Sequence, residues 1–407
     1  MILQLKRIDW TLFILLILLL TVGIFAIYSA STQKVGNDFF SEDFYLRQIV
    51  WIIISLVIML AVLRLPLSLI DLAVVPSYII SLILLLLVLF LPEIKGSHRW
   101  IQFSPFNIQP SEIAKLSTLL VLAKVLAKPN LREDQILARA FAIALPPFLL
   151  ILMEPDLGTA LTIMMITFSL LTISDLPLYY LILLVSPILS IVMSFFSIPL
   201  FIGYILLLTF VLFKSRLSLL IIGLAGIFNT FIFFFTPMIW NSLKDYQQNR
   251  ILSFIDPSRD PFGAGYQIIQ SKIAIGSGRI MGKGFLLGTQ KNLNFLPEHH
   301  TDFIFSVIGE ETGFLGCIIV MFLFLLLFIR IAKIITKLKQ KEFRYTATGI
   351  LAFLSFQTFV NIGMTLGIVP TTGIPLPFIS YGGSNLLINV TAISLILKFL
   401  SERSIFK

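Results

Sequence analysis

Long apolar runs, separated by short polar segments, dominate the chain. A membrane-spanning helix needs about 20 predominantly apolar residues, and about twelve runs reach or approach that length. We expect helices over 10–28, 46–63, 69–91, 112–127, 137–153, 158–174, 177–196, 198–213, 217–236, 303–331, 345–368 and 383–400. The neighbouring runs 177–196 and 198–213 are compatible with two spans or with one re-entrant excursion. The pattern therefore predicts an all-α, polytopic transmembrane helix bundle of about 10–12 spans.

The composition agrees with a lipid environment. Hydrophobic residues make up 57% of the 407 residues and charged residues only 13%, and the mean hydropathy is +0.98. A soluble domain is about a quarter charged, so this chain lacks the polar surface that it would need to face water. The single cysteine, Cys317, excludes an internal disulfide, and the three histidines make a buried zinc site unfavourable.

Basic residues are distributed unevenly over the short connections. Lys and Arg cluster in 124–139, 214–216 and 330–344, whereas 30–45 carries three acidic residues. Because cytoplasmic loops are enriched in Lys and Arg, we expect both ends of the chain in the cytoplasm. The same asymmetry accounts for most of the net charge of +9, so we expect no nucleic-acid partner.

This topology places the polar, glycine-rich segment 237–302 outside the cytoplasm. A segment of this length is either a flexible linker or an ordered loop with a function. Apolar stretches within it, such as 273–275 and 285–287, favour packing on the bundle or on the bilayer surface. We therefore predict an ordered extracytoplasmic loop over 237–302.

Charged residues also occur at helix ends. Glu112 and Lys115 lie three residues apart, on one face of the fourth predicted helix. They form either a capping carboxylate with a lysine that reaches toward the membrane surface, or a charged pair that lines a polar cavity. Ser111 is expected to cap this helix. Asp156 is expected to cap the predicted helix over 158–174.

The polar segment 237–302 contains a further candidate functional residue, Asp260. Asp260 directly precedes the turn Pro261-Phe262-Gly263-Ala264-Gly265, whose glycines allow a ligand to approach the backbone closely. Taken alone, this aspartate is more typical of an ordinary turn former than of a catalytic residue. The chain contains no Walker A, H-E-x-x-H, G-x-S-x-G or paired C-x-x-C motif, which disfavours nucleotide-driven transport by this chain alone.

Several long motifs together resemble the SEDS family (shape, elongation, division, sporulation), most closely its RodA-type elongation branch. The most specific are DPFGAGYQIIQSKIAIGSG from Asp260, GKGFLLGTQ from Gly282 and FLPEHHTDFIFSVIGEETGFLG from Phe295. QPSEIAKL at 109–116, EPDLGTAL at 154–161 and PLPFISYGGSN at 375–385 support them. The resemblance covers nearly the whole chain and implies a single SEDS-type membrane domain over 1–407. The apolar stretch 177–216 departs from it, being longer than in the usual ten-span layout.

The resemblance implies a peptidoglycan glycosyltransferase that polymerises lipid II into glycan strands and releases undecaprenyl pyrophosphate. Asp260 matches the proposed catalytic aspartate of the family. Inversion from an α-linked donor to a β-linked product needs a general base, for which a carboxylate is suited. The leaving pyrophosphate needs cationic residues, or a divalent cation as a possible cofactor. The candidate substrate-binding residues are Arg47, Arg99, Glu112, Lys115, Lys272, Lys283 and His300.

The resemblance also implies partners and a location. Family members work with a class B penicillin-binding protein, a transpeptidase, and with other membrane proteins of the elongation complex. We expect a multi-pass protein of the inner (cytoplasmic) membrane with its active site on the extracytoplasmic face. The alternative function is a lipid II flippase or another lipid-carrier transporter, because a polar cavity within the membrane suits both activities.

Overall fold

The computed structural model describes residues 9–35, 38–41, 43–92, 98–103, 106–215, 217–243, 248–249, 252–254, 256–257, 264–292 and 300–402. The chain forms two compact units. One combines Met1–Leu170 with Ser253–Lys407, and the other is Leu171–Leu252. The assignment of 1–407 to one domain stays a prediction.

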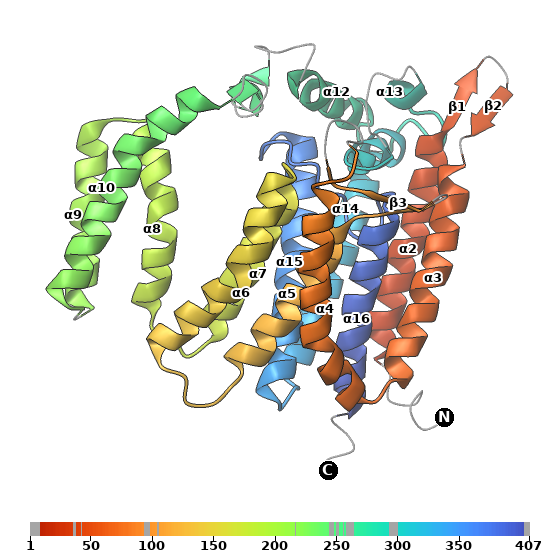
Figure 1. Cartoon of the computed structure of the whole chain (residues 1–407). Coiled ribbons are helices and arrows are strands. Elements are labelled where there is room, and N and C mark those ends of the chain that lie inside the picture. Colours follow the sequence, from red (N-terminus) through yellow and green to blue (C-terminus); the bar gives the residue numbers. More distant parts are fainter. Residues whose placement is uncertain are drawn as a thin grey trace. The chain divides into compact units, whose positions relative to one another are not determined.

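Helices make up most of the first unit (Figure 1). They are α2 (Trp10–Ser31), α3 (Phe44–Arg64), α4 (Leu67–Val88), α5 (Pro110–Leu126), α6 (Glu133–Met153), α7 (Leu157–Ile173), α12 (Ala264–Ser277), α13 (Thr289–Asn292), α14 (Ile304–Ile335), α15 (Lys341–Leu366) and α16 (Gly383–Glu402). The second unit holds α8 (Leu178–Ser194), α9 (Ile198–Lys214) and α10 (Leu219–Ser242). Each of the twelve predicted runs is a helix.

The helices confirm a multi-span membrane protein. Among the described residues, 8 helices are both long and apolar enough to cross a membrane. The helices α7, α8 and α9 are apolar but have only 17 residues each, at the short end of the range for a span. The short runs 177–196 and 198–213 are therefore two separate helices, α8 and α9.

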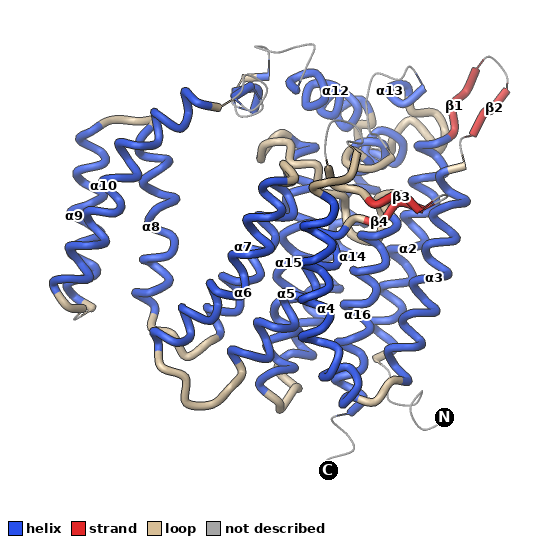
Figure 2. Tube along the Cα trace, viewed as in Figure 1, coloured by secondary structure: helices blue, strands red, loops and turns tan. Residues whose placement is uncertain are grey.

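Two short antiparallel hairpins link helices of the first unit (Figure 2). In the first, β1 (Thr32–Val35) pairs with β2 (Asp38–Ser41). In the second, β3 (Ile101–Phe103) pairs with β4 (Phe106–Ile108). The first hairpin connects α2 to α3, and the second connects α4 to α5. The apolar pattern predicted no structure for these two connections.

Apolar and small residues pack the first unit. One hydrophobic cluster is shared by the four helices α4, α5, α6 and α7. It comprises Leu85, Ala114, Ala144, Ile151, Ala160 and Ile163. Gly23 of α2 lies so close to the 378–379 backbone that a Cβ would come within 2.7 Å of the Phe378 carbonyl oxygen. Small residues at such positions let helices approach closely, which supplies the dispersion contacts that hold a bundle together in lipid.

The segment 237–302 differs from the expected loop. Helix α10 passes Pro237 and ends only at Ser242, so the ninth apolar run was predicted too short. Within the segment, α12 and α13 are helical. The segment is thus partly built of helices, and its assignment as an extracytoplasmic loop over 237–302 stays a prediction.

Candidate active site

Polar side chains gather at one end of the first unit, where α5, α14 and α16 begin and α6 ends. Figure 1 shows α12, α13 and both hairpins at this same end. Three features build it: the 154–156 turn, the first turns of α5 and a break in α14. All of them belong to the first unit.

Asp156 is the centre of the turn between α6 and α7. Its Oδ1 accepts the Thr159 backbone N–H at 3.2 Å, and its Oδ2 accepts the Thr159 hydroxyl at 2.9 Å, which confirms the predicted helix cap. The same Oδ2 accepts the Gln109 amide at 2.9 Å and the Ser111 hydroxyl at 3.4 Å. Ser111 was expected to cap α5, but it lies inside that helix and instead ties its first turn to Asp156.

Glu154 lies two residues before Asp156 in a contrasting environment. Its side chain is fully buried, and neither carboxylate oxygen has a hydrogen-bond partner among the described residues. Burial raises the pKa of Glu154 to about 8, the nearby Asp156 carboxylate adds to this rise, and Arg99 opposes it. Arg99 donates through Nε to the Glu154 carbonyl at 3.0 Å, and also to the Pro155 carbonyl. The guanidinium therefore caps the end of α6 rather than pairing with the Glu154 carboxylate.

The expected pair of Glu112 and Lys115 is present one turn into α5. Lys115 Nζ lies 2.6 Å from Glu112 Oε2, and the two side chains are 0% and 4% exposed. The lysine therefore does not reach the membrane surface, which excludes that reading of the pair. It lies 5.1 Å from the centre of the Phe353 ring on α15, so the pair is enclosed between helices.

Helix α14 is broken at Gly313, whose φ of 69° is readily available only to glycine. The break separates the carbonyls of Glu310 and Glu311 from their usual helical donors. Instead they accept the N–H groups of Lys283 and Gly284, both at 3.0 Å. The freed N–H groups of Phe314 and Leu315 donate to the carbonyls of Arg279 and Ile280, at 2.9 and 3.2 Å. The segment after α12 is thus hydrogen-bonded into the break in α14.

The Glu310 side chain holds the next part of this segment. It is buried, and its Oε1 accepts Lys283 Nζ at 2.6 Å. The same oxygen accepts the Thr289 N–H at 2.8 Å, the Thr289 hydroxyl at 2.9 Å and the Gln290 N–H at 3.2 Å. One buried carboxylate therefore fixes both ends of the 283–290 segment. We call Glu310 and the donors from 283–290 the α14 clamp.

Comparison with known proteins identifies the family. The FtsW/RodA/SpoVE model, described as a cell cycle protein, matches residues 9–203 and 199–405. The chain belongs to this family. It is 36% identical over 403 residues to the peptidoglycan glycosyltransferase MrdB of Escherichia coli K12, covering 98% of this chain and 94% of the relative. It is 34% identical to the peptidoglycan glycosyltransferase RodA of Treponema pallidum, with 96% of each chain covered.

Solved structures agree with this family assignment. A chain from a study of how a peptidoglycan synthase complex coordinates polymerization and crosslinking superposes with a TM-score of 0.72 at 30% identity, covering 97% of this chain and 98% of that one. The rod shape determining protein RodA of Thermus thermophilus gives a TM-score of 0.64 at 25% identity, covering 97% of each chain. The FtsW/RodA/SpoVE fold therefore extends over nearly the entire chain.

The other predicted site residues of this FtsW/RodA/SpoVE protein lie as follows. Asp260 is outside the described residues. Within the described part of the chain, the exposed Arg47 and Lys272 side chains have no hydrogen-bond or ion-pair partner, and Lys272 lies against Gly367. The His300 ring stacks on Phe44 with 4.4 Å between ring centres. The two lysines Lys115 and Lys283, by contrast, are each paired with a glutamate.

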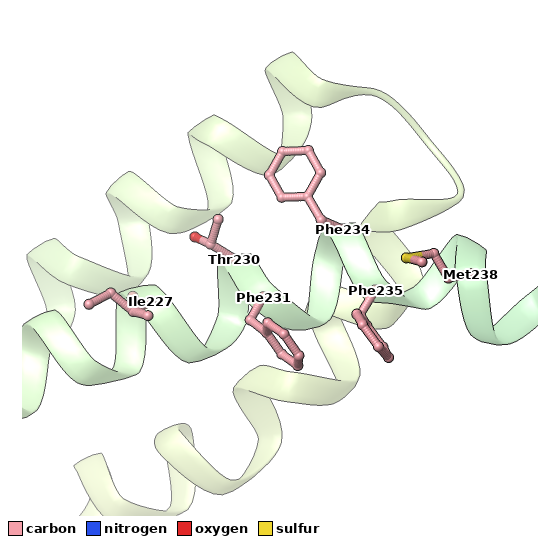
Figure 3. A pocket seen from close by; sticks show the side chains of 7 residues that line it. Ile227, Thr230, Phe231, Phe234, Phe235 and Met238 are labelled. Atoms are coloured by element: carbon pink, nitrogen blue, oxygen red, sulfur yellow. The ribbon is translucent and has the colours of Figure 1, made fainter.

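Among the described residues, no three His, Cys, Asp or Glu side chains are grouped to hold a metal ion. A hollow of about 630 Å³ lies on α10 in the second unit, lined by Ile227, Thr230, Phe231, Phe234, Phe235 and Met238 with Gly226 (Figure 3). Its lining contains no ionisable group, so it offers no chemistry for sugar transfer.

Sequence reasoning gave no role to Glu310 and treated 154–156 only as a capped turn. A glutamate at the head of an apolar run was a usable signal, because a carboxylate within a span is costly and usually has a function. The partners of Glu310 could not be found this way, since they lie 20 to 27 residues earlier in the chain.

Proposed function

We propose that this protein is a peptidoglycan glycosyltransferase that polymerises lipid II into glycan strands during cell elongation and rod-shape maintenance. The observation that carries the proposal is the family match over nearly the whole chain, with relatives named as peptidoglycan glycosyltransferases. The charged groups gathered at one end of the first unit support it, because a transferase needs acid–base and anion-stabilising groups in one place.

Asp260 is the proposed catalytic base. It would remove the proton from the 4-hydroxyl of the acceptor sugar while that oxygen attacks the anomeric carbon of the donor. The bond from that carbon to the pyrophosphate breaks, the configuration inverts, and undecaprenyl pyrophosphate leaves. Asp260 lies four residues before α12, and α12 is anchored to its neighbours: Ser271 Oγ lies 2.6 Å from Ser306 Oγ and 2.6 Å from the Thr365 carbonyl oxygen.

Among the proposed substrate-binding residues, Arg47 and Lys272 are the best placed to hold the pyrophosphate. Their charges are not balanced by a carboxylate in the described structure, whereas Lys115 and Lys283 are neutralised by Glu112 and Glu310. We infer that Glu112, Lys115 and Lys283 shape the site, that Arg99 fixes the end of α6, and that His300 lines the site.

The proposal includes a location and partners. The basic loops favour cytoplasmic ends and an extracytoplasmic active site in the inner membrane. A class B penicillin-binding protein would cross-link the strands, together with other membrane proteins of the elongation complex. In support, one solved relative comes from a synthase complex that couples polymerization to crosslinking.

The deciding experiment is polymerisation of lipid II by the purified protein in detergent, with its partner transpeptidase present but blocked. We expect glycan strands on a gel of the reaction products. A flippase or lipid-carrier transporter would leave lipid II unpolymerised under these conditions, because there is no membrane for it to cross. Absence of polymer with a folded, partner-bound protein would contradict the proposed activity.

A further inference from the structure

The connection between α14 and α15 is strongly basic. It lies at the end of the first unit opposite α12 and α13 (Figure 1), away from the candidate active site. Six Lys or Arg residues fall within positions 330–344, against one acidic residue, Glu342. The six are Arg330, Lys333, Lys337, Lys339, Lys341 and Arg344. Groups of four to eight cations directly after a membrane helix are typical of segments that attract anionic lipid head groups.

The cations of this connection differ from others at the same end of the unit in lacking carboxylate partners. Three others form ion pairs with nearby acids: Lys124 with Asp71, Arg132 with Asp134 and Lys398 with Glu402. Within the connection, Arg330 is paired, and its Nε donates to Asp9 at 2.9 Å. In the described part of the chain, the exposed side chains of Lys333, Lys337 and Lys339 have neither an ion pair nor a hydrogen bond. The enrichment of cytoplasmic loops in basic residues explains where these lysines lie, but not why they gather without carboxylates.

The fold holds these lysines in place. The N–H groups of Lys337 and Leu338 donate to the carbonyls of Ile334 and Ile335, at 2.9 and 3.2 Å, so the chain turns tightly after α14. Leu338 is only 4% exposed and anchors the turn in the bundle. The lysines on either side of it, at 337 and 339, are therefore kept at the surface in a short, hydrogen-bonded segment rather than on a long loop.

Helix α14 adds an apolar surface that leads to the lysines. Phe322, Leu325 and Ile329 follow one another at helical spacing and are 55%, 51% and 41% exposed. Lys333 lies four residues after Ile329, on the same face of the helix. The opposite face, which includes Leu327, is buried in the bundle. One exposed face thus carries apolar side chains along the membrane span and a cation at its end, which matches the acyl chain and the head group of a phospholipid.

We propose that the α14–α15 connection and the exposed face of α14 bind an anionic glycerophospholipid. Lys333, Lys337 and Lys339 would donate to its phosphate group, because charge-assisted hydrogen bonds to phosphate are strong. Its acyl chains would lie along the apolar face of α14. An acidic partner protein would satisfy the lysines but would leave the continuity between the apolar face and Lys333 without a role. The site is separate from the sugar-transfer site and does not depend on the proposed function.

The test is native mass spectrometry of the purified full-length protein in detergent, titrated with phosphatidylglycerol or with phosphatidylcholine of the same acyl chains. We expect the first phosphatidylglycerol to bind about tenfold or more tightly than phosphatidylcholine. A basic residue near anionic lipid contributes about fivefold in affinity, so Lys333→Gln, Lys337→Gln and Lys339→Gln should each weaken binding by about that factor. The triple variant should bind both lipids alike. All three positions are exposed, so the variants should unfold at the same temperature as the unaltered protein.

A second triple variant separates a specific site from general attraction. Lys128→Gln, Arg132→Gln and Arg139→Gln remove the same charge from the connection between α5 and α6, and this variant should keep the preference for phosphatidylglycerol within about twofold. Glycerol 3-phosphate, which has the phosphate without acyl chains, should not displace the bound lipid. Equal affinity for the two lipids in the unaltered protein, or equal losses in the two triple variants, would overturn the proposed site. Displacement by glycerol 3-phosphate would also overturn it.

Discussion

In the α8–α10 unit, the buried polar side chains are neutral, and three of them, Ser186, Ser190 and Asn229, join α8 to α10. Ser190 donates to Asn229 Oδ1 at 2.7 Å, and the Asn229 amide donates to Ser186 Oγ at 3.1 Å. At the site end of the first unit, the buried side chains instead include carboxylates, such as the fully buried Glu154 and the clamp residue Glu310. Neutral pairs hold membrane helices together, whereas buried charges are costly and are kept where they serve a function.

The two regions also differ in how completely their polar groups are paired. Asn229 makes hydrogen bonds through both its oxygen and its nitrogen. At the site end, the Glu154 carboxylate, the Asn361 oxygen and the Asn385 amide each have an unpaired atom. Unpaired buried atoms also occur elsewhere among the described residues of the first unit, for example at Ser55, Thr118 and Gln357. Buried polar atoms without a protein partner indicate places where ordered water is expected.

The largest expected effect comes from Asp260→Asn. This change keeps the shape and hydrogen-bonding capacity of the side chain but removes the base. Loss of a general base typically slows a reaction about 10²–10⁴-fold, so polymerisation of lipid II by the purified complex should nearly vanish while expression and partner binding persist. Asp256→Asn, four residues earlier, is the matched control and should cause a much smaller loss. Retention of more than roughly half of the activity by Asp260→Asn would rule out the mechanism.

Next in size is the effect of loosening the α14 clamp with Glu310→Gln. Glutamine keeps the volume but loses the charge that binds Lys283 and the three donors of Thr289 and Gln290. Hydrogen bonds to charged groups contribute about 1.5–3 kcal/mol each, so we expect the polymerisation rate to fall about tenfold or more. The KM for lipid II should change less than kcat, because the clamp positions the segment after α12 and does not touch the substrate.

A double-mutant cycle separates the clamp from general destabilisation. Lys283→Met and Glu310→Gln should each slow polymerisation, and the double variant should lose less than the two effects combined, because both remove the same contact. Strictly additive losses would show that the two residues act independently and that Glu310 is not positioning 283–290 through Lys283.

The unpaired carboxyl of Glu154 predicts a pH effect of intermediate size. Its pKa is about 8 in the folded protein against an ordinary value of 4.5, so the folded state binds this proton more tightly than the unfolded state. Stability should therefore decrease as the pH rises from about 4.5 to about 8 and should lose no more above that. Glu154→Gln cannot ionise and should escape this part of the decrease.

Thermal and denaturant unfolding at several pH values measure the difference. At pH 5.0 ± 0.5, near the ordinary range for a glutamate, the two proteins should be similarly stable. Near a pH of about 8.5, Glu154→Gln should be more stable by about 1.4 kcal/mol or more, since one pKa unit corresponds to about 1.4 kcal/mol. Parallel stability curves would mean that Glu154 stays ionised or finds a partner.

The apolar pattern was enough to predict the helices, because each membrane span must satisfy its own backbone and bury its own side chains in lipid or protein. The pair of Glu112 and Lys115 was also predictable, because both residues lie on one helical face. Lys283 was taken as a substrate cation because its partner Glu310 is 27 residues away, at the head of a different helix. The break at Gly313 was invisible for the same reason: its hydrogen bonds are made by a distant segment.

The smallest effect is expected in the α8–α10 unit, from Asn229→Leu. Leucine removes the amide that joins α10 to Ser186 and Ser190 on α8, but it adds no charge. Hydrogen bonds between membrane helices contribute only about 0.6 kcal/mol on average, so the free energy of unfolding should fall by about 0.5–1.5 kcal/mol. Ser186 already donates to the carbonyl of Leu183 at 2.9 Å, so it keeps a partner after the change.

A lipid II polymerisation assay of the Asn229→Leu variant tests whether the neutral cluster of α8–α10 has only a structural role. If the neutral cluster only joins helices, the purified variant should keep activity within about twofold, as an exposed substitution would. Asn229→Asp is the informative companion: it has nearly the same size but adds a charge among apolar neighbours, so it should destabilise the protein far more than leucine does. A folded Asn229→Leu variant without activity would place α8–α10 among the functional parts of the molecule and would remove the distinction between the two regions.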